Sequence, residues 1–360
     1  MMLLQSLLNP VLEFHRLCEK QTASGASLIQ FDQALVSRSL DEGSLFFDLS
    51  TRGKVEVVGP EAGLFLHNLC TNEIVSMPIG AGVEAFFGNS RARIVAWANI
   101  FHVLLSRGRD GFWIDLPQGM EDEFIRHLDR HLISEQVEFS DRSHEFCQVH
   151  LMGPRSNVIL SSIIDTDFPR LARWQHMERN IGDAVCHIRR VDWLGSEGYD
   201  IVFLVKHGNP IVKLLLECGA KFGCEETWEK LRIAACLPKI GNEIDASVFI
   251  PELGRNHISV SGSKGCYLGQ EPIVMARDRG QINKKLVLME IDGFESMTSR
   301  SSLIASGKEL GKITSICKGI NGKILALGFV KKELWEVGKI VDCCTDGQQF
   351  KVTVLPFANL

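Results

Sequence analysis

The sequence predicts an α+β fold in which two related α+β lobes precede a C-terminal β-barrel. The chain of 360 residues is too long for one ordinary hydrophobic core and indicates two or three domains. A strand that ends in a Gly-Pro turn and leads into a helical segment occurs twice, at Gly59-Pro60 and 94 residues later at Gly153-Pro154. From Leu286 onward, short β-rich runs alternate with turn residues, which is typical of a small barrel or sandwich.

The first lobe is expected to begin at residue 45. Its first clear strand is the alternating run from Lys54 to Val58, and residues 61–70 then place apolar side chains at helical spacing. The elements expected after these are strands at 94–106 and 110–116 and an amphipathic helix at 120–133 with Phe124, Ile125, Leu128 and Leu132 on one face.

A second round of the same pattern begins near residue 147. The expected elements are strands at 147–152, 187–195 and 199–205, and helices at 156–164 and 211–220. We therefore predict three regions: an N-terminal helical segment at 1–44 that packs on the lobes, the two lobes at 45–285, and the barrel at 286–360.

The charge balance excludes a protein that binds nucleic acid mainly through its electrostatic field. The formal net charge is −5, whereas such proteins usually carry a strongly basic domain. No uninterrupted apolar run approaches the ~18 residues that a membrane helix needs. Eleven scattered cysteines without a CxxC pair indicate a reducing compartment. We therefore expect a cytoplasmic protein with no membrane partner and no direct, stable nucleic-acid partner.

One cysteine lies in an unusual context, the loop SGSKGCYLGQE at residues 261–271. Cys266 follows Lys264 and has glycines on both sides, so a cation and backbone N–H groups could favour its thiolate form. Glu271-Pro272 then suits the start of a helix, and Gly280 can end it. Cys266 and Lys264 are therefore candidate catalytic residues. The alternative is that Cys266 is a small buried apolar residue and that the glycines only form a turn.

Two further groups of polar residues carry weaker signals. His127 and His131 are four residues apart on an expected helix, but no third ligand is near them in the sequence, and we expect no metal site. Three acids could accept hydrogen bonds from the amidine edge of a pterin or a purine, or could be ordinary loop acids: Glu243, Asp245 and Glu252.

The loop also resembles a known family. KGCYLGQE at 264–271, followed by Arg279, Gly280, Lys284 and Leu286 in the spacing RGxxxKxL, resembles the signature of YgfZ-type folate-binding proteins. These proteins are the iron–sulfur maturation branch of the glycine-cleavage T-protein superfamily. Other segments that are similar to this superfamily, in the same order, are 47–74, 192–201, 228–245 and 307–335.

The resemblance implies a three-domain ring of the T-protein type whose central hole takes tetrahydrofolate and is bordered by the cysteine loop. In the branch that transfers aminomethyl groups, two acids lie in a GGIVDDL-like segment. Ala96 and Trp97 stand at these positions here, which argues against that reaction. The sequence departs from the YgfZ pattern at Ala234, where a glutamate is expected, and at Met275, where an arginine is expected.

We therefore expect a folate-binding protein that assists the maturation or repair of iron–sulfur enzymes, including enzymes that modify tRNA. Cys266 would be the functional thiol, with Lys264 favouring the thiolate, and the expected partners are a reduced folate and iron–sulfur client enzymes. Two alternatives remain: a folate-dependent aminomethyl or one-carbon transferase, and a non-catalytic scaffold paralogue. The residues expected to bind or position the folate are Gln270, Glu271, Glu243, Asp245, Glu252 and Arg279.

Overall fold

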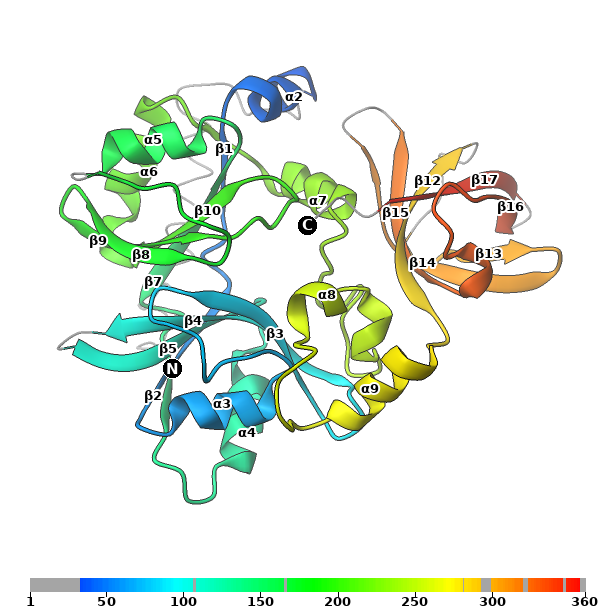
Figure 1. Ribbon diagram of the computed structural model, residues 1–360. Coiled ribbons are helices and arrows are strands. Elements are labelled where there is room, and N and C mark those ends of the chain that lie inside the picture. Colours follow the sequence, from blue (N-terminus) through cyan, green and yellow to red (C-terminus); the bar gives the residue numbers. More distant parts are fainter. Residues whose placement is uncertain are drawn as a thin grey trace, which may run out of the picture.

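Two β-sheets face each other between layers of helices, and a closed six-stranded barrel stands beside them (Figure 1). The computed structural model describes residues 33–356, apart from 106–107, 165–166, 281, 293–298, 320–322 and 346–347. This arrangement confirms the predicted α+β fold with a C-terminal β-barrel.

The first lobe is a five-stranded antiparallel sheet with two helices on its outer face. Its strands, in spatial order, are β3 (Gly82–Gly88), β4 (Ile94–Leu105), β5 (Arg109–Leu116), β2 (Gly53–Val58) and β6 (Glu138–Asp141). The helices are α3 (Ala62–Leu69) and α4 (Glu121–His131).

The second lobe repeats this plan with a six-stranded sheet. Its strands, in spatial order, are β11 (Lys221–Phe222), β1 (Leu45–Asp48), β7 (Phe146–Met152), β10 (Gly198–Leu204), β9 (Ala184–Arg190) and β8 (His176–Ile181), with helices α5 (Ser156–Ile163) and α6 (Gly208–Glu217). The expected second round did not include β1. This strand precedes β2 in the chain but pairs with β7, so the chain crosses from the second sheet to the first between residues 49 and 52.

Both Gly-Pro turns are built in the same way. The carbonyl oxygen of Gly59 accepts a hydrogen bond from Ala62 N, and that of Gly153 accepts one from Ser156 N, so each turn starts a helix. The φ angles of the two glycines are 126° and 110°, which residues with a Cβ rarely adopt. The second turn therefore repeats the geometry of the first.

The barrel is joined to the lobes by short helices and by a shared hydrophobic cluster. The connecting elements are α7 (Glu225–Ala234), η3 (Ile250–Leu253), α8 (Asn256–Ser259) and α9 (Gln270–Arg279). The barrel strands, in spatial order, are β12 (Lys285–Asp292), β15 (Ile324–Val330), β14 (Lys308–Lys318), β13 (Ser302–Ala305), β16 (Ile340–Thr345) and β17 (Gln348–Leu355).

The expected N-terminal helical segment falls mostly outside the described residues, because 1–32 are not described. Its described part is helix α2 (Gln33–Glu42), and Leu40 of this helix packs against Leu45, Phe47 and Met152 of the second lobe. Helix α2 thus packs on the second lobe, and the assignment of residues 1–44 to one helical segment stays a prediction.

Side-chain alternation along the strands decides what each sheet face presents. On β4, Ala96 and Ala98 pack under the helices of the first lobe, so Trp97 and Asn99 point to the opposite face. On β7, Val149 packs under the helices of the second lobe. The inner faces of the two sheets therefore carry the residues that the helical layers do not cover.

Candidate functional site

The inner faces of the two sheets hold polar side chains that are buried almost completely. Glu84, Asn99 and Asp115 come from the first sheet, and none is more than 1% exposed. Gln148, His150, Arg189 and Asp200 come from the second sheet and are all 0% exposed. We call these seven residues, together with Arg52, Trp97 and Trp193, the inter-sheet cluster.

An ion pair joins the two sheets at the middle of this cluster. Arg189 Nη1 donates to Asp115 Oδ2 at 2.7 Å, and Trp113 Nε1 donates to the other carboxylate oxygen at 3.0 Å. The Arg189 guanidinium also lies 4.4 Å from the centre of the Phe101 ring. Asp115 is therefore held by a cation and an indole.

Asp200 organises the second-sheet side of the cluster. Its Oδ1 accepts from His150 Nδ1 at 2.7 Å, and its Oδ2 accepts from Gln148 Nε2 at 2.9 Å and from Trp193 Nε1 at 3.1 Å. The Arg52 guanidinium lies over the Trp193 ring, 4.6 Å from the ring centre. This network fixes the orientation of Trp193 at the edge of the cluster.

Glu84 anchors the other side of the cluster to helix α8. Arg255 donates to both carboxylate oxygens at 2.8 and 2.6 Å, and Ser259 Oγ donates as well. Burial alone would raise the pKa of Glu84, but Arg255 and these hydrogen bonds outweigh it and hold the pKa below its ordinary value. Glu84 is thus ionised and already paired.

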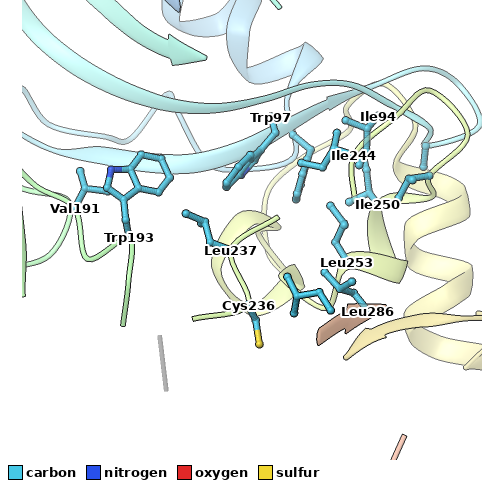
Figure 2. Close-up of a cluster of buried hydrophobic side chains, with 14 of the residues drawn as sticks. Ile94, Trp97, Val191, Trp193, Cys236, Leu237, Ile244, Ile250, Leu253 and Leu286 are labelled. Carbon is cyan, nitrogen blue, oxygen red and sulfur yellow. The ribbon is translucent and has the colours of Figure 1, made fainter. Parts of the chain in front are cut away.

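Two aromatic side chains border the cluster on its apolar side. The rings of Trp97 and Trp193 are 5.9 Å apart and meet edge to face at 83°. Figure 2 shows Trp97 descending from β4, with Trp193 beside it and Leu237 facing both rings. Flat indole surfaces next to buried polar groups are what an aromatic heterocycle needs for stacking and hydrogen bonding.

Several buried polar atoms of the cluster have no hydrogen-bond partner among the residues that the structure describes. They include Arg52 Nε, Asn99 Nδ2 and Oδ1, Gln148 Oε1, His150 Nε2, and Arg189 Nε and Nη2. Leaving a buried donor or acceptor unpaired costs about 1–3 kcal/mol, so native proteins usually satisfy such groups with solvent or a ligand. Donors and acceptors are both present, which suits a heterocycle that carries both.

Burial also controls the charges around the cluster. Lys54, which is 0% exposed, donates from Nζ to the carbonyl oxygens of Ser50 and Arg52 at 3.2 and 2.7 Å. Burial lowers the pKa of Lys54 to about 8, although the charge of Asp115 acts in the opposite direction. Burial likewise lowers the pKa of Arg52.

Stability is expected to fall when the pH drops from 6.5 to 4.5. Burial lowers the pKa of His127 and His176 to about 4 and that of His187 to about 3. Below pH 6.5 the unfolded chain binds protons at these positions and the folded chain does not, so each histidine removes up to about 1.4 kcal/mol per pH unit. Urea unfolding at pH 7.5, 6.5, 5.5 and 4.5 measures this slope. His176→Gln should reduce the slope by up to about 1.4 kcal/mol per pH unit, and a flat profile for the wild type would contradict the assignment.

The cysteine loop lies apart from the ion pairs of the cluster, along the edge of the first lobe. Cys266 is exposed, and it is the only exposed thiol among the cysteines that the structure describes. Lys264 is 8% exposed and donates from Nζ to the carbonyl oxygens of His67, Cys70 and Asn72, at 2.5, 2.8 and 2.9 Å. Among the described contacts, Lys264 therefore binds the end of α3 and not Cys266. Its predicted effect on the Cys266 thiolate stays a prediction.

Helix α9 begins and ends where the sequence predicts. Gln270 is its first residue and donates from Nε2 to Gly265 O at 3.3 Å, which ties the helix to the cysteine loop. Glu271 lies in the first turn and Arg279 in the last, both exposed, and Gly280 ends the helix at a φ of 62°. Gln270 thus contacts the cysteine loop, and the contribution of Gln270, Glu271 and Arg279 to folate binding stays a prediction.

The three loop acids are separated by the fold. Glu243 is 0% exposed and accepts from Arg232 Nη1 at 3.1 Å and from Ser315 Oγ at 2.7 Å, so it joins α7 to the barrel. Asp245 is exposed and accepts from Ser247 N at 2.7 Å. Glu252 accepts from Phe249 N at 3.2 Å. Glu243 and Asp245 thus have different partners and exposure, and the contribution of the three acids to folate binding stays a prediction.

Metal binding gains no support from the histidine pair. His131 Nδ1 lies 2.8 Å from His127 O, so this ring is tied to the backbone of its own helix. Within the described ranges, no group of three or more His, Cys, Asp or Glu side chains could hold an ion. In the same part of the chain, no helix is long and apolar enough to span a membrane.

Sequence reasoning missed the inter-sheet cluster. A signal is present in CQVHLM at 147–152, which alternates apolar and polar residues, whereas Asp115 is the single charged residue of FWIDL at 112–116. Alternation of this kind ordinarily indicates a strand with one solvated face. The polar faces of the two sheets are buried because they lie against each other, joined by the ion pair of Asp115 and Arg189. This contact is visible only in the structure.

Comparisons with known proteins agree with this architecture. The GCVT N-terminal domain matches residues 37–257, and the glycine cleavage T-protein C-terminal barrel domain matches residues 284–358. The chain belongs to the glycine cleavage T-protein family. The matches place it in this superfamily and do not distinguish the YgfZ-type branch.

Relatives from this family cover most of the chain. A chloroplastic protein of Arabidopsis thaliana, named as a candidate transferase, is 27% identical over 86% of this chain and 70% of its own length. An aminomethyltransferase of Desulfitobacterium hafniense is 24% identical over 86% of this chain and 85% of its own. The crystal structure of aminomethyltransferase T of the glycine cleavage system from Bartonella henselae superposes with a TM-score of 0.77 at 17% identity, over 88% of this chain and 86% of that one. The T-protein fold is therefore confirmed.

Proposed function

We propose that the protein binds a reduced folate, such as tetrahydrofolate, at the inter-sheet cluster. The observation that carries this proposal is the set of unpaired buried donors and acceptors beside the indoles of Trp97 and Trp193. A reduced pterin is a flat heterocycle that carries an amidine and a carbonyl, so it can satisfy both kinds of group while it stacks on an indole. Membership of a family whose transferases use tetrahydrofolate supports the same ligand.

Asn99 offers the sharpest test, because neither polar atom of its side chain has a hydrogen-bond partner in the described part of the chain. Asn99→Leu should leave the fold intact and weaken tetrahydrofolate binding at least about tenfold, since two hydrogen bonds to the ligand would be lost. Anaerobic calorimetric titration measures the affinity. Asn180→Leu on the exposed face of β8 makes the same chemical change away from the cluster and should bind like the wild type. Equal affinity of Asn99→Leu and the wild type would contradict the proposal.

The bound folate is proposed to serve the maturation or repair of iron–sulfur enzymes. Two observations support this role over aminomethyl transfer. Ala96 and Trp97 occupy the positions of the expected acidic pair, and the carboxylates described in the cluster, Glu84, Asp115 and Asp200, are each already held by donors. A general base needs a free carboxylate within reach of its proton. The exposed thiol of Cys266 remains accessible to a partner protein.

A second candidate function is folate-dependent transfer of a one-carbon or aminomethyl group. The names of the relatives favour it, because the bacterial proteins are called aminomethyltransferases. Formation of methylenetetrahydrofolate from an amine donor by the purified protein would support this function. A scaffold without chemistry is the third candidate. The cytoplasmic location and the iron–sulfur client enzymes stay predictions in all three cases.

Replacement of Cys266 separates the candidates in cells. Cys266→Ser is expected to reduce the activity of iron–sulfur enzymes in the host strain by more than half, with unchanged amounts of the protein and unchanged folate binding. Cys344→Ser on β16, where the thiol is partly buried, is the matched control and should have no effect. Normal activities of iron–sulfur enzymes in the Cys266→Ser strain would contradict a role of the Cys266 thiol in maturation. This result would favour the transferase or the scaffold.

A further inference from the structure

A polar cavity lies where the loop 241–248 meets the barrel, outside the inter-sheet cluster. Its volume is about 380 Å³. The residues that carry its polar character are Asn242, Asp245, Ser247, Lys284, Arg300 and Lys312. Gly241, Ser299 and Thr314 also line it, together with three hydrophobic residues, Val248, Ile313 and Phe329. Val248 and Phe329 also belong to the cluster that contains Trp97. We call this space the junction cavity.

Positive charge dominates the junction cavity. The lining contains three cationic side chains and one carboxylate, that of Asp245. The cations are Lys284, Arg300 and Lys312. Lys284 is partly balanced by Glu252, whose Oε2 lies 3.8 Å from its Nζ, and its ammonium lies 4.6 Å from the centre of the Phe329 ring. Arg300 and Lys312 have no ion-pair partner among the residues that the structure describes. Two unpaired cations in one cavity attract an anion.

The backbone that presents Arg300 is unusual. Its φ is 85°, a conformation that costs about 1–3 kcal/mol for a residue with a side chain. Two hydrogen bonds impose it, from Arg300 N to Ile313 O at 2.8 Å and from Ile313 N to Ser301 O at 2.9 Å. Strand β14 also has an irregular register between Ile313 and Ser315, which turns Thr314 toward the cavity. Strain that is held by surrounding structure often marks a binding site.

The opposite wall of the cavity is held rigidly. Ser315 Oγ donates to Glu243 Oε1 at 2.7 Å and accepts from Asn242 Nδ2 at 3.0 Å and from Arg232 Nη2 at 2.7 Å. These bonds tie the loop 241–243 to the barrel. The cations therefore surround a space whose shape exists before any ligand arrives, which lowers the entropic cost of binding.

We propose that the junction cavity binds an anion that carries several carboxylate groups or a phosphate group. Arg300 and Lys312 make the charged contacts, and Lys284 contributes from the inner side. Val248 and Phe329 line the cavity and belong to the hydrophobic cluster that contains Trp97. Figure 2 shows three other members of this cluster beside Trp97: Ile244, Ile250 and Leu286. One source of the carboxylates is the γ-linked glutamate tail of a folate, an assignment that rests on the proposed function. The source of a phosphate group would be a free phosphorylated metabolite.

Titrations with small anions test the cavity without any folate. The probes are γ-linked triglutamate and inorganic phosphate, measured by calorimetry at low and at physiological salt. The double variant Arg300→Gln/Lys312→Gln should bind the preferred probe at least tenfold more weakly than the wild type. Lys308→Gln/Lys332→Gln removes the same charge from barrel positions outside the cavity and should bind like the wild type. Failure of both probes to bind, or equal affinity of the double variant, would overturn the proposal.

The two sources are separated by comparing tetrahydrofolate with one and with three glutamates. If the tail is the ligand, the triglutamate form binds the wild type at least tenfold more tightly, and the double variant loses this advantage. If phosphate binds while γ-linked triglutamate does not, the cavity takes a phosphorylated ligand. Binding of either free anion together with no binding of any folate would overturn the proposed function and leave the junction cavity as assigned.

Discussion

Arg189→Met is expected to lower the free energy of unfolding by about 3–5 kcal/mol. The substitution leaves Asp115 fully buried between the two sheets without the cation that now lies 2.7 Å from it. Trp113 would still donate to the carboxylate, but one neutral donor cannot replace a guanidinium in a buried site. Urea unfolding at pH 7.5, followed by tryptophan fluorescence and by circular dichroism, measures the loss.

A double variant shows whether the loss comes from the unpaired charge or from the missing packing. Arg189→Met/Asp115→Leu removes both charges and should recover most of the stability, because buried ion pairs are often replaced by apolar residues at little cost. Lys213→Met breaks the exposed pair with Glu217 on α6 and should leave stability unchanged. If the double variant is as unstable as Arg189→Met, packing and not charge would be the cause.

Gly59→Ala is expected to destabilise the protein by about 3 kcal/mol or more. A Cβ at this position would lie 2.1 Å from the carbonyl oxygen of Gln136, and the φ of 126° is itself unfavourable for alanine. The obstacle is backbone, so the clash can be relieved only by moving the segment that leads into β6. Thermal and urea unfolding measure the effect.

Gly119 offers a matched control for the clash. Its φ of 82° is also positive, but a Cβ there would meet nothing within 4 Å. Gly119→Ala should therefore cost only about 1 kcal/mol, the backbone contribution alone. Gly153→Ala should behave like Gly59→Ala, because its Cβ would lie 2.7 Å from Gly43 O. If Gly59→Ala and Gly119→Ala lowered stability equally, the clash with the Gln136 carbonyl oxygen would not be the cause of the loss at Gly59.

Local patterns predicted most of the helices and strands. The run from Lys54 to Val58 is within β2, the helix expected at 120–133 is α4, and the six β-rich runs after Leu286 are the six strands of the barrel. Each of these segments has a period or a turn residue that its own sequence displays. Phe124 and Leu128, expected on the apolar face of α4, are 0% exposed.

The candidate site could be predicted only in part, because its contacts join distant segments. The context of Cys266 is visible in its loop sequence, and its role stays a prediction, whereas the contacts of Lys264 with residues 67–72 depend on how that loop packs. The bond between Asp115 and Arg189 links residues 74 positions apart on different sheets. No local period encodes such a pairing, and a buried polar residue looks like a solvated one in the sequence.

The position of β1 determines how the chain can assemble as it is made. Strand β1 ends at Asp48, but its antiparallel partner β7 starts only at Phe146 and its parallel partner β11 starts at Lys221. At a synthesis rate of about 5–20 residues per second, a β1 strand that has left the ribosome waits roughly 5–20 s for β7. During this interval the first sheet can form around β2, while Leu45, Phe46 and Phe47 remain uncovered. Nascent chains of this protein should therefore engage a chaperone until residue 152 has emerged, and the second lobe expressed alone from residue 146 would lack a strand from the interior of its sheet.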